Sequence, residues 1–272
     1  MFDVGGVFFL MNLRFHTFVI CAYGKSPYLR ACIHSLKAQT VPTKIICTTS
    51  TPSPWLEKLL KEQEIPLYIR KGESNIQEDW NYAIQKAESR FVTIAHQDDL
   101  YSRHYVEELS KAASRYPDMT VFMSDGVLIK KEKIAWGGAV ELVKKILRFP
   151  WRIKGLCHLS IVKKSGLILG NPVMCPSCSY QKALVDLPLF SGGYGYVLDW
   201  ECMRKLADQP GRFVCVEKPL LYYRIHDGAA TKECIKNHRR EQEEQQMFEK
   251  MWPRQMAAAL MKVYQMAYWN YQ

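Results

Sequence analysis

The chain has 272 residues, of which 48% are hydrophobic and 24% charged, a globular composition that excludes a disordered protein. No apolar stretch reaches the roughly 20 residues that a membrane-spanning helix needs. The formal net charge is +10, and the nine cysteines are scattered and odd in number, so we interpret them as reduced thiols in a cytoplasmic protein.

The first half of the chain alternates strand and helix patterns. Runs of β-branched and aromatic residues predict strands at 15–20, 44–48, 66–70, 91–95 and 120–129. Apolar residues at helical spacing predict helices that begin at Ser26, Trp55, Ser74 and Tyr105, with Ser26 as the N-cap of the first and Pro27 at its first helical position. Strands joined by crossover helices predict an α/β fold with a mostly parallel sheet flanked by helices. In such sheets ligands bind outside the carboxyl ends of the strands.

After residue 129 the pattern is less regular. A helix is predicted to start at Asp199-Trp200-Glu201, and strands are predicted at 213–216 and 220–225. A charged helix over about 232–251 and a Met-rich helix after Pro253 end the chain.

Two adjacent acids, Asp98 and Asp99, directly follow the apolar strand at 91–95. Their charges repel each other, which indicates a hard divalent cation such as Mg²⁺ or Mn²⁺, because these ions prefer oxygen ligands and substrate phosphates. The alternative is that the acids cap the next helix, since Asp is a favoured N-cap.

A basic segment follows the first half. Residues 130–164 hold ten Lys or Arg against two acids, and within them 140–154 alternates apolar and basic residues at near-helical spacing. Such a stretch suits an anionic membrane surface or a phosphate-bearing partner. A solvated insertion whose apolar stripe packs on the core explains it equally well.

Five motifs in this order resemble family 2 glycosyltransferases of the GT-A fold, over about residues 15–231. They are Val19-Ile20-Cys21-Ala22-Tyr23, Asp79-Trp80-Asn81, His96-Gln97-Asp98-Asp99-Leu100-Tyr101, Asp199-Trp200-Glu201 and Tyr223-Arg224-Ile225-His226. The resemblance implies a Rossmann-like GT-A fold and a metal-dependent inverting hexosyltransferase. Such an enzyme moves a sugar from a nucleotide-sugar donor to a hydroxyl acceptor and uses Mn²⁺ or Mg²⁺.

The resemblance also implies roles for the acidic residues. In the family the second aspartate of the pair is a metal ligand and the first approaches the ribose and the metal, which gives these roles to Asp99 and Asp98. His226 would complete the metal's ligands, the alternative being a loop histidine with local hydrogen bonds. Asp199 matches the general base, and Glu201 is its backup, although an acid in a first helical turn is also favoured by the helix dipole.

Further residues match the donor site. Ala22 and Tyr23 match the turn that lines the nucleobase pocket, and Thr49 and Asn81 fall at donor-binding positions. Arg224 contacts the diphosphate or merely pairs with an acid. Two departures leave the nucleobase open: Thr48-Thr49-Ser50 stands where many relatives carry an aspartate pair, and Trp80-Asn81 replaces the usual Arg-Asn.

We therefore predict a glycosyltransferase domain over residues 1–232, with a nucleotide-sugar-binding half at 13–129 and an acceptor-binding half with the basic insertion at 130–232. A helical appendage at 233–272 follows. The expected acceptor is a glycan or lipid-linked glycan in surface polysaccharide synthesis, at the inner face of the membrane, with peripheral contact through 140–154.

The alternative is a GT-A-like scaffold without catalysis that acts as a basic membrane- or nucleic-acid-binding module. No nucleic-acid partner is expected, because the acid pair would repel phosphate. The donor sugar, the linkage and the oligomeric state stay open.

Overall fold

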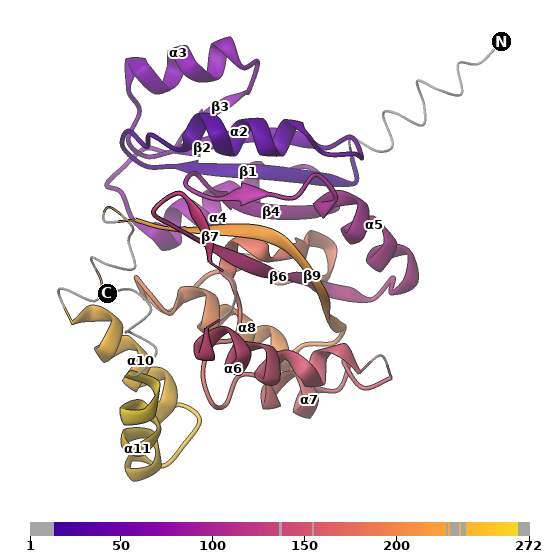
Figure 1. The fold of residues 1–272 in the computed structure, drawn as a ribbon, viewed down its shortest axis with the longest axis vertical. Coiled ribbons are helices and arrows are strands. Elements are labelled where there is room, and N and C mark those ends of the chain that lie inside the picture. The colour runs from indigo at the N-terminus through magenta and orange to yellow at the C-terminus, as the bar shows by residue number, and fades with distance from the viewer. Residues whose placement is uncertain are drawn as a thin grey trace.

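One mixed sheet organises the protein, with helices on both of its faces (Figure 1). The computed structural model describes residues 14–135, 138–153, 155–226, 228, 234 and 238–265. Within these residues the sheet has nine strands in the order β3-β2-β1-β4-β8-β6-β9-β5, with β7 paired to β6. The predicted α/β fold class is confirmed.

The first half of the chain forms the parallel part of the sheet. Its elements are β1 (His16–Ala22), α2 (Leu29–Lys37), β2 (Lys44–Thr49), α3 (Pro54–Glu62), β3 (Leu67–Ile69), α4 (Ile76–Lys86), β4 (Phe91–His96), β5 (Leu100–Tyr101), α5 (Tyr105–Arg115) and β6 (Met119–Lys130). Strands β3, β2, β1 and β4 pair in parallel, so their carboxyl ends meet at one edge. Every strand and helix predicted here is present, with ends that differ by a few residues.

The second half adds strands that pair in both directions and most of the short helices. Its elements are β7 (Lys133–Ala135), α6 (Ala139–Arg148), η1 (Phe149–Arg152), α7 (Ser160–Ser165), η2 (Cys175–Ser177), β8 (Ser179–Gln181), η3 (Lys182–Leu184), α8 (Leu198–Asp208), β9 (Arg212–Ile225), α10 (Arg239–Glu249) and α11 (Arg254–Tyr264). The two strands predicted at 213–216 and 220–225 are one strand, β9, whose pairing with β6 shifts register between Ser124 and Gly126. Strands β5, β7 and β8 were not predicted, because two or three residues carry too little periodicity to detect.

The starts of two helices test the predicted N-caps. Helix α2 begins at Leu29, and Tyr28 is its N-cap, so the prediction that Ser26 caps it is wrong. Helix α5 begins at Tyr105 with His104 at the N-cap. The acids at 98–99 therefore lie a full turn too early to cap it, and the capping alternative is wrong.

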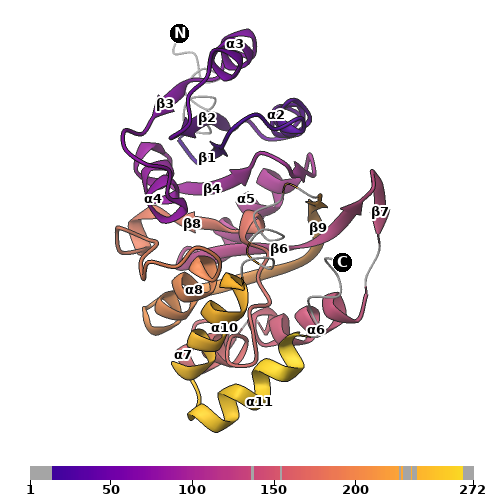
Figure 2. The same ribbon diagram turned by 90° about the vertical axis from the view of Figure 1, so that its left-hand side faces the viewer.

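Alternate residues of β1 enter two different cores. Phe18 and Ile20 pack with α2, α3 and α5 on one face of the sheet, whereas Val19 packs with α4 and α8 on the other. Met247 of α10 and Met261 of α11 belong to this second core. Figure 2 shows α8, α10 and α11 together at the end of the molecule opposite α3. The domain boundary at 232–233 lies outside the described residues and stays a prediction.

None of the helices in the described ranges is both long and apolar enough to cross a bilayer. All nine cysteines, including Cys175 and Cys178, are free thiols.

Candidate active site

The carboxyl ends of the parallel strands bring the predicted donor residues to one edge. The Thr49 hydroxyl donates to the carbonyl of Ala22 at 2.8 Å, which ties the ends of β2 and β1 together. The side-chain amide of Gln97 donates to the Tyr23 carbonyl at 2.9 Å and accepts from its N–H at 3.2 Å. The Tyr23 side chain itself is 65% exposed. The loops after β1 and β4 are thereby held side by side, with an aromatic ring free at their surface.

Asp98 faces the late histidine of the motif series. Its Oδ1 accepts a hydrogen bond of 2.5 Å from the Ser26 hydroxyl, and its Oδ2 lies 3.2 Å from Nε2 of His226. The three residues come from the loop after β1, the loop after β4 and the end of β9. The fold thus brings together Asp98 and His226, as the motifs predicted, and adds Ser26, which was expected to cap a helix.

Asp99 turns the other way, into the protein. It is 2% exposed, its Oδ1 accepts from the Arg224 N–H at 2.9 Å, and its Oδ2 has no hydrogen-bond partner among the described residues. Burial raises the pKa of Asp99 well above its usual range, and the charge of Asp98 raises it further. Nδ1 of His96 lies 4.0 Å from that free oxygen. Burial lowers the pKa of His96 to about 4, so this ring is neutral at pH 7.

Arg224 connects the loop that carries Asp98 and Asp99 to β9. Its Nε donates to the Asp98 carbonyl at 3.1 Å, and its Nη1 pairs with Glu132 at 2.6 Å. The guanidinium lies 4.3 Å from the centre of the Tyr28 ring, which also packs against His226. Arg224 therefore pairs with an acid, and a contact with a diphosphate stays a prediction.

Asp199 lies in the first turn of α8. Its Oδ2 accepts from the side-chain amide of Asn171 at 3.0 Å, and its Oδ1 accepts from the Trp200 N–H at 2.8 Å. Burial raises the pKa of Asp199 to about 6, although these hydrogen bonds and the charge of Lys144 oppose the shift. A carboxyl group with this pKa is ionised at pH 7 and still takes up a proton readily.

Two contacts from the C-terminal helices hold the chain around Asp199. The Tyr264 hydroxyl of α11 accepts from the N–H of Asn171 at 3.1 Å. The Glu243 carboxylate of α10 accepts from the N–H groups of residues 195–197, which precede α8. Sequence motifs did not predict either residue, because both act from outside the matching region.

Glu201 lies two residues after Asp199, in the same first turn of α8, and is surrounded by cations. It is 2% exposed and pairs with Arg204 at 2.8 Å and with Lys250 at 3.0 Å. Burial alone would raise the pKa of Glu201, but the two cations outweigh it and the pKa is lowered. A carboxylate held in this way is a poor proton acceptor, so the backup role gains no support and stays a prediction.

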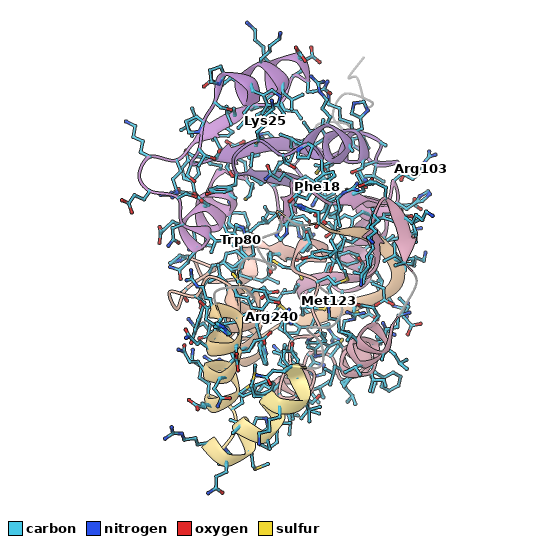
Figure 3. All side chains as sticks on the ribbon, turned by 60° about the vertical axis from the view of Figure 1, so that its left-hand side comes forward. Phe18, Lys25, Trp80, Arg103, Met123 and Arg240 are labelled. Atoms are coloured by element: carbon cyan, nitrogen blue, oxygen red, sulfur yellow. The ribbon has the colours of Figure 1, made fainter. Side chains whose placement is uncertain are left out.

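Asn81 and Trp80 of α4 both contact the chain before α8. The Asn81 amide donates to the Phe190 carbonyl at 2.7 Å and accepts from its N–H at 2.9 Å. Trp80, labelled in Figure 3, is 8% exposed, and its ring contacts those of Phe190 and His96. Trp80 is therefore a core residue, and the Asn81 side chain positions the loop at Phe190. A donor contact by Asn81 stays a prediction.

One polar cluster was not predicted. Asp79 of α4 pairs with Nε of Arg70 at 2.6 Å, and the hydroxyls of Ser50 and Ser74 donate to it at 2.9 and 3.2 Å. Ser50 directly follows β2, where many of the resembling enzymes carry an aspartate. Here a carboxylate reaches this place from α4. The signal was present in the Asp79-Trp80-Asn81 motif, but only the fold reveals the partner.

The sequence profile of glycosyl transferase family 2 matches residues 17–158, about half of the chain. The chain belongs to this family. The matched part contains the Asp98–Asp99 pair, whereas Asp199, Arg224 and His226 lie beyond it. No curated protein matches the chain significantly in sequence.

Solved structures with the same fold are distant in sequence. Residues 1–349 of TarS from S. aureus, in complex with UDP-GlcNAc, are 14% identical with a TM-score of 0.59, and the match covers 79% of this chain and 60% of that chain. The mannosyltransferase PcManGT from Pyrobaculum calidifontis, in complex with GDP-Man and Mn²⁺, is 13% identical with a TM-score of 0.61, covering 90% and 69%. This chain thus spans about three fifths of the TarS fragment. The likeness shows a GT-A glycosyltransferase fold.

Proposed function

We propose that this family 2 glycosyltransferase is a metal-dependent, inverting hexosyltransferase that moves a sugar from a nucleotide-sugar donor to a hydroxyl acceptor. The observation that carries the proposal is the pairing of Asp98 with His226 at the carboxyl edge of the sheet, together with an Asp199 carboxyl group whose pKa is about 6. Two GT-A neighbours with bound nucleotide sugars support a donor of this class.

The residues at this edge fit a divalent cation that is shared with a substrate. In the described part of the chain, no three His, Cys, Asp or Glu side chains converge to hold a metal ion alone. Mg²⁺ and Mn²⁺, however, commonly take one or two protein ligands and complete their shell with phosphate oxygens and water. Nε2 of His226 is buried without a hydrogen-bond partner among the described residues, 3.2 Å from the Asp98 carboxylate.

We assign the metal to Asp98 and His226. Asp99 stays a candidate ligand through its unpaired Oδ2, but its other oxygen holds the backbone of Arg224. The main role we assign to Asp99 is therefore to fix the loop that presents Asp98. A divalent cation bound here would stabilise the negative charge on the departing diphosphate.

Asp199 would act as the general base. The acceptor oxygen forms its bond to the anomeric carbon as the bond to the diphosphate oxygen breaks, and the bonding electrons leave with the diphosphate. The hydroxyl proton passes to the Asp199 carboxylate, so that a single displacement inverts the anomeric carbon. Asn171 and the Trp200 N–H stabilise the ionised form before the reaction, which keeps the base ready at neutral pH.

The nucleobase would lie beyond β1 and β2, between the exposed Tyr23 ring and the polar cluster around Asp79. The Asp79 cluster offers both a carboxylate and hydroxyl groups at this edge. We propose a glycan or lipid-linked glycan of a surface polysaccharide as the acceptor, at the cytoplasmic face of the membrane. The nine free thiols agree with a reducing compartment.

Calorimetric titration with a panel of nucleoside diphosphates, with and without Mn²⁺, tests the donor site. We expect one nucleotide to bind in a Mn²⁺-dependent way and Asp98→Ala and His226→Ala each to weaken this binding at least tenfold. If no nucleotide binds to the wild type, or if neither substitution matters, the proposed site is wrong.

Transfer assays with the corresponding nucleotide sugars test the base. Asp199→Asn should reduce turnover by at least about 10³-fold while nucleotide affinity stays unchanged. Asp208→Asn is a matched control on the same helix, since Asp208 is half exposed and pairs only with Lys164 among the described contacts. A protein that binds membranes or nucleic acid without catalysis would show no effect of Asp199→Asn on its binding.

A further inference from the structure

Helix α6 is amphipathic, but its apolar side faces the solvent instead of the core. Leu142, Val143 and Ile146 are 61%, 52% and 63% exposed, and Phe149, directly after the helix, is 59% exposed. These positions are spaced i, i+1, i+4 and i+7, so they share one face. The only fully buried side chain of α6 is charged, that of Arg148. Helix α5, of similar length, instead buries several large apolar side chains.

Ion pairs hold α6 on the protein. Nη2 of Arg148 lies 2.7 Å from the Asp125 carboxylate of β6, and its Nη1 donates to the Pro172 carbonyl. Arg152 reaches the same carboxylate at 3.0 Å, and Lys145 approaches it at 3.8 Å. Asp125 is 3% exposed. Because the helix docks through its charged side, its apolar side has no partner within the described residues.

Further exposed apolar residues follow the helix in the sequence. Ile153, Leu156, Leu159 and Ile161 are 39%, 42%, 39% and 76% exposed. With the four residues of α6 and η1, they form what we call the apolar face, which holds eight of the sixteen large apolar residues exposed in the described part of the chain. Half of these residues therefore lie in one stretch, 142–161. Such a concentration marks an interaction surface.

The positive charge near the apolar face indicates an anionic partner. Residues 130–164 carry ten Lys or Arg and two acids, and the whole chain carries +10. Arg148 and Lys163 are buried, and Lys145, Arg148 and Arg152 share one Asp125 carboxylate, so the segment keeps a positive balance that is smaller than the count. A basic segment with exposed Leu, Ile and Phe is the pattern of a helix that lies in the interface of an anionic bilayer. Helices α6 and α7 lie toward the end of the molecule away from α2 and α3 (Figures 1 and 2).

We propose that the apolar face docks this protein on the surface of an anionic lipid bilayer, with α6 parallel to the membrane plane. Arg148 of α6 donates to the carbonyl of Pro172, and the neighbouring Asn171 donates to the Asp199 carboxylate. A bilayer at this face would therefore lie beside the chain that carries the candidate base. The docking surface itself does not depend on the transferase proposal.

Vesicle co-sedimentation of the full chain tests this surface. We expect binding to vesicles of phosphatidylcholine mixed with phosphatidylglycerol, weaker binding to phosphatidylcholine alone, and weaker binding in high salt. Leu142→Ser and Ile146→Ser should each lower the partition coefficient about tenfold or more, because each removes a large apolar side chain from the interface. Both side chains are exposed, so the variants should melt at the wild-type temperature.

Val263→Ser is the matched control, since Val263 is 67% exposed on α11 and outside the apolar face. Equal binding by the wild type and both variants, or no binding to anionic vesicles, would overturn the proposal. Light scattering without lipid separates the main alternative: a dimer that Ile146→Ser converts to a monomer would show that a second copy covers the face, which also overturns it. Nucleotide binding is measured on the same variants and should not change. A negative result for vesicle binding therefore overturns only the docking proposal, and a negative result for nucleotide binding overturns only the donor site.

Discussion

Replacing Glu243 on α10 should destabilise the protein. The side chain is 9% exposed, and its carboxylate accepts from Gly195, Tyr196 and Val197 at 2.7 to 3.1 Å and from Arg239 at 2.7 Å. Burial alone would raise the pKa of Glu243, but Arg239 and the three N–H groups outweigh it and the pKa is lowered, so the group is ionised at neutral pH.

The size of the effect follows from these contacts. A hydrogen bond to a charged group contributes about 1.5–3 kcal/mol, and three N–H donors lose their acceptor in Glu243→Ala. Glu243 also lines an open hollow of about 490 Å³ between α10 and the loop at 192–194, so water can reach part of the site and replace some bonds. We therefore expect a net loss of about 3 kcal/mol, below the gross sum, and about 1 kcal/mol for Glu243→Gln, which keeps one acceptor oxygen.

Urea denaturation followed by tryptophan fluorescence measures this loss. Glu249→Ala is the matched control, because Glu249 is exposed on the same helix and bonds only Gln245 among the described contacts; its loss should stay below about 0.5 kcal/mol. A Glu243→Ala protein within 1 kcal/mol of the wild type would refute the view that α10 anchors the start of α8.

Two further predictions concern the surroundings of Asp199, the proposed base. Because the Asp199 pKa is about 6, the carboxylate form dominates above that pH, and kcat should fall about tenfold per pH unit below it. Asn171→Ala removes a hydrogen-bond donor to the carboxylate and should therefore move this fall in kcat to higher pH. Both effects are measured in pH–rate profiles at saturating donor. A flat profile down to pH 5 would contradict the assignment. Gly170 has φ +141°, and a Cβ there would overlap the Tyr264 ring, so Gly170→Ala should cost about 2 kcal/mol or more in thermal unfolding. Gly155→Ala is the control, since a Cβ there meets no atom within 4 Å and the change should be nearly neutral.

The sequence by itself determined the fold class and the edge of the sheet at which the candidate residues lie. Apolar periodicity is a local property, so the alternation of strands and helices from β1 to β6 could be predicted with small errors at the ends. Since parallel strands share a carboxyl edge, the residues at 22–23, 49 and 98–99 had to come together. Very short strands, such as β8, carry no such pattern and were found only in the structure.

The tertiary structure decided what each polar side chain does. Asp98 and Asp99 are neighbours in sequence, yet one faces His226 and the other accepts from the backbone of β9. Glu201 is surrounded by cations, and the Asn81 amide holds a distant loop. These partners lie far away along the chain, so no local pattern contains them. A carboxylate's role depends on burial and on the charges around it, and both are set only when the chain has folded.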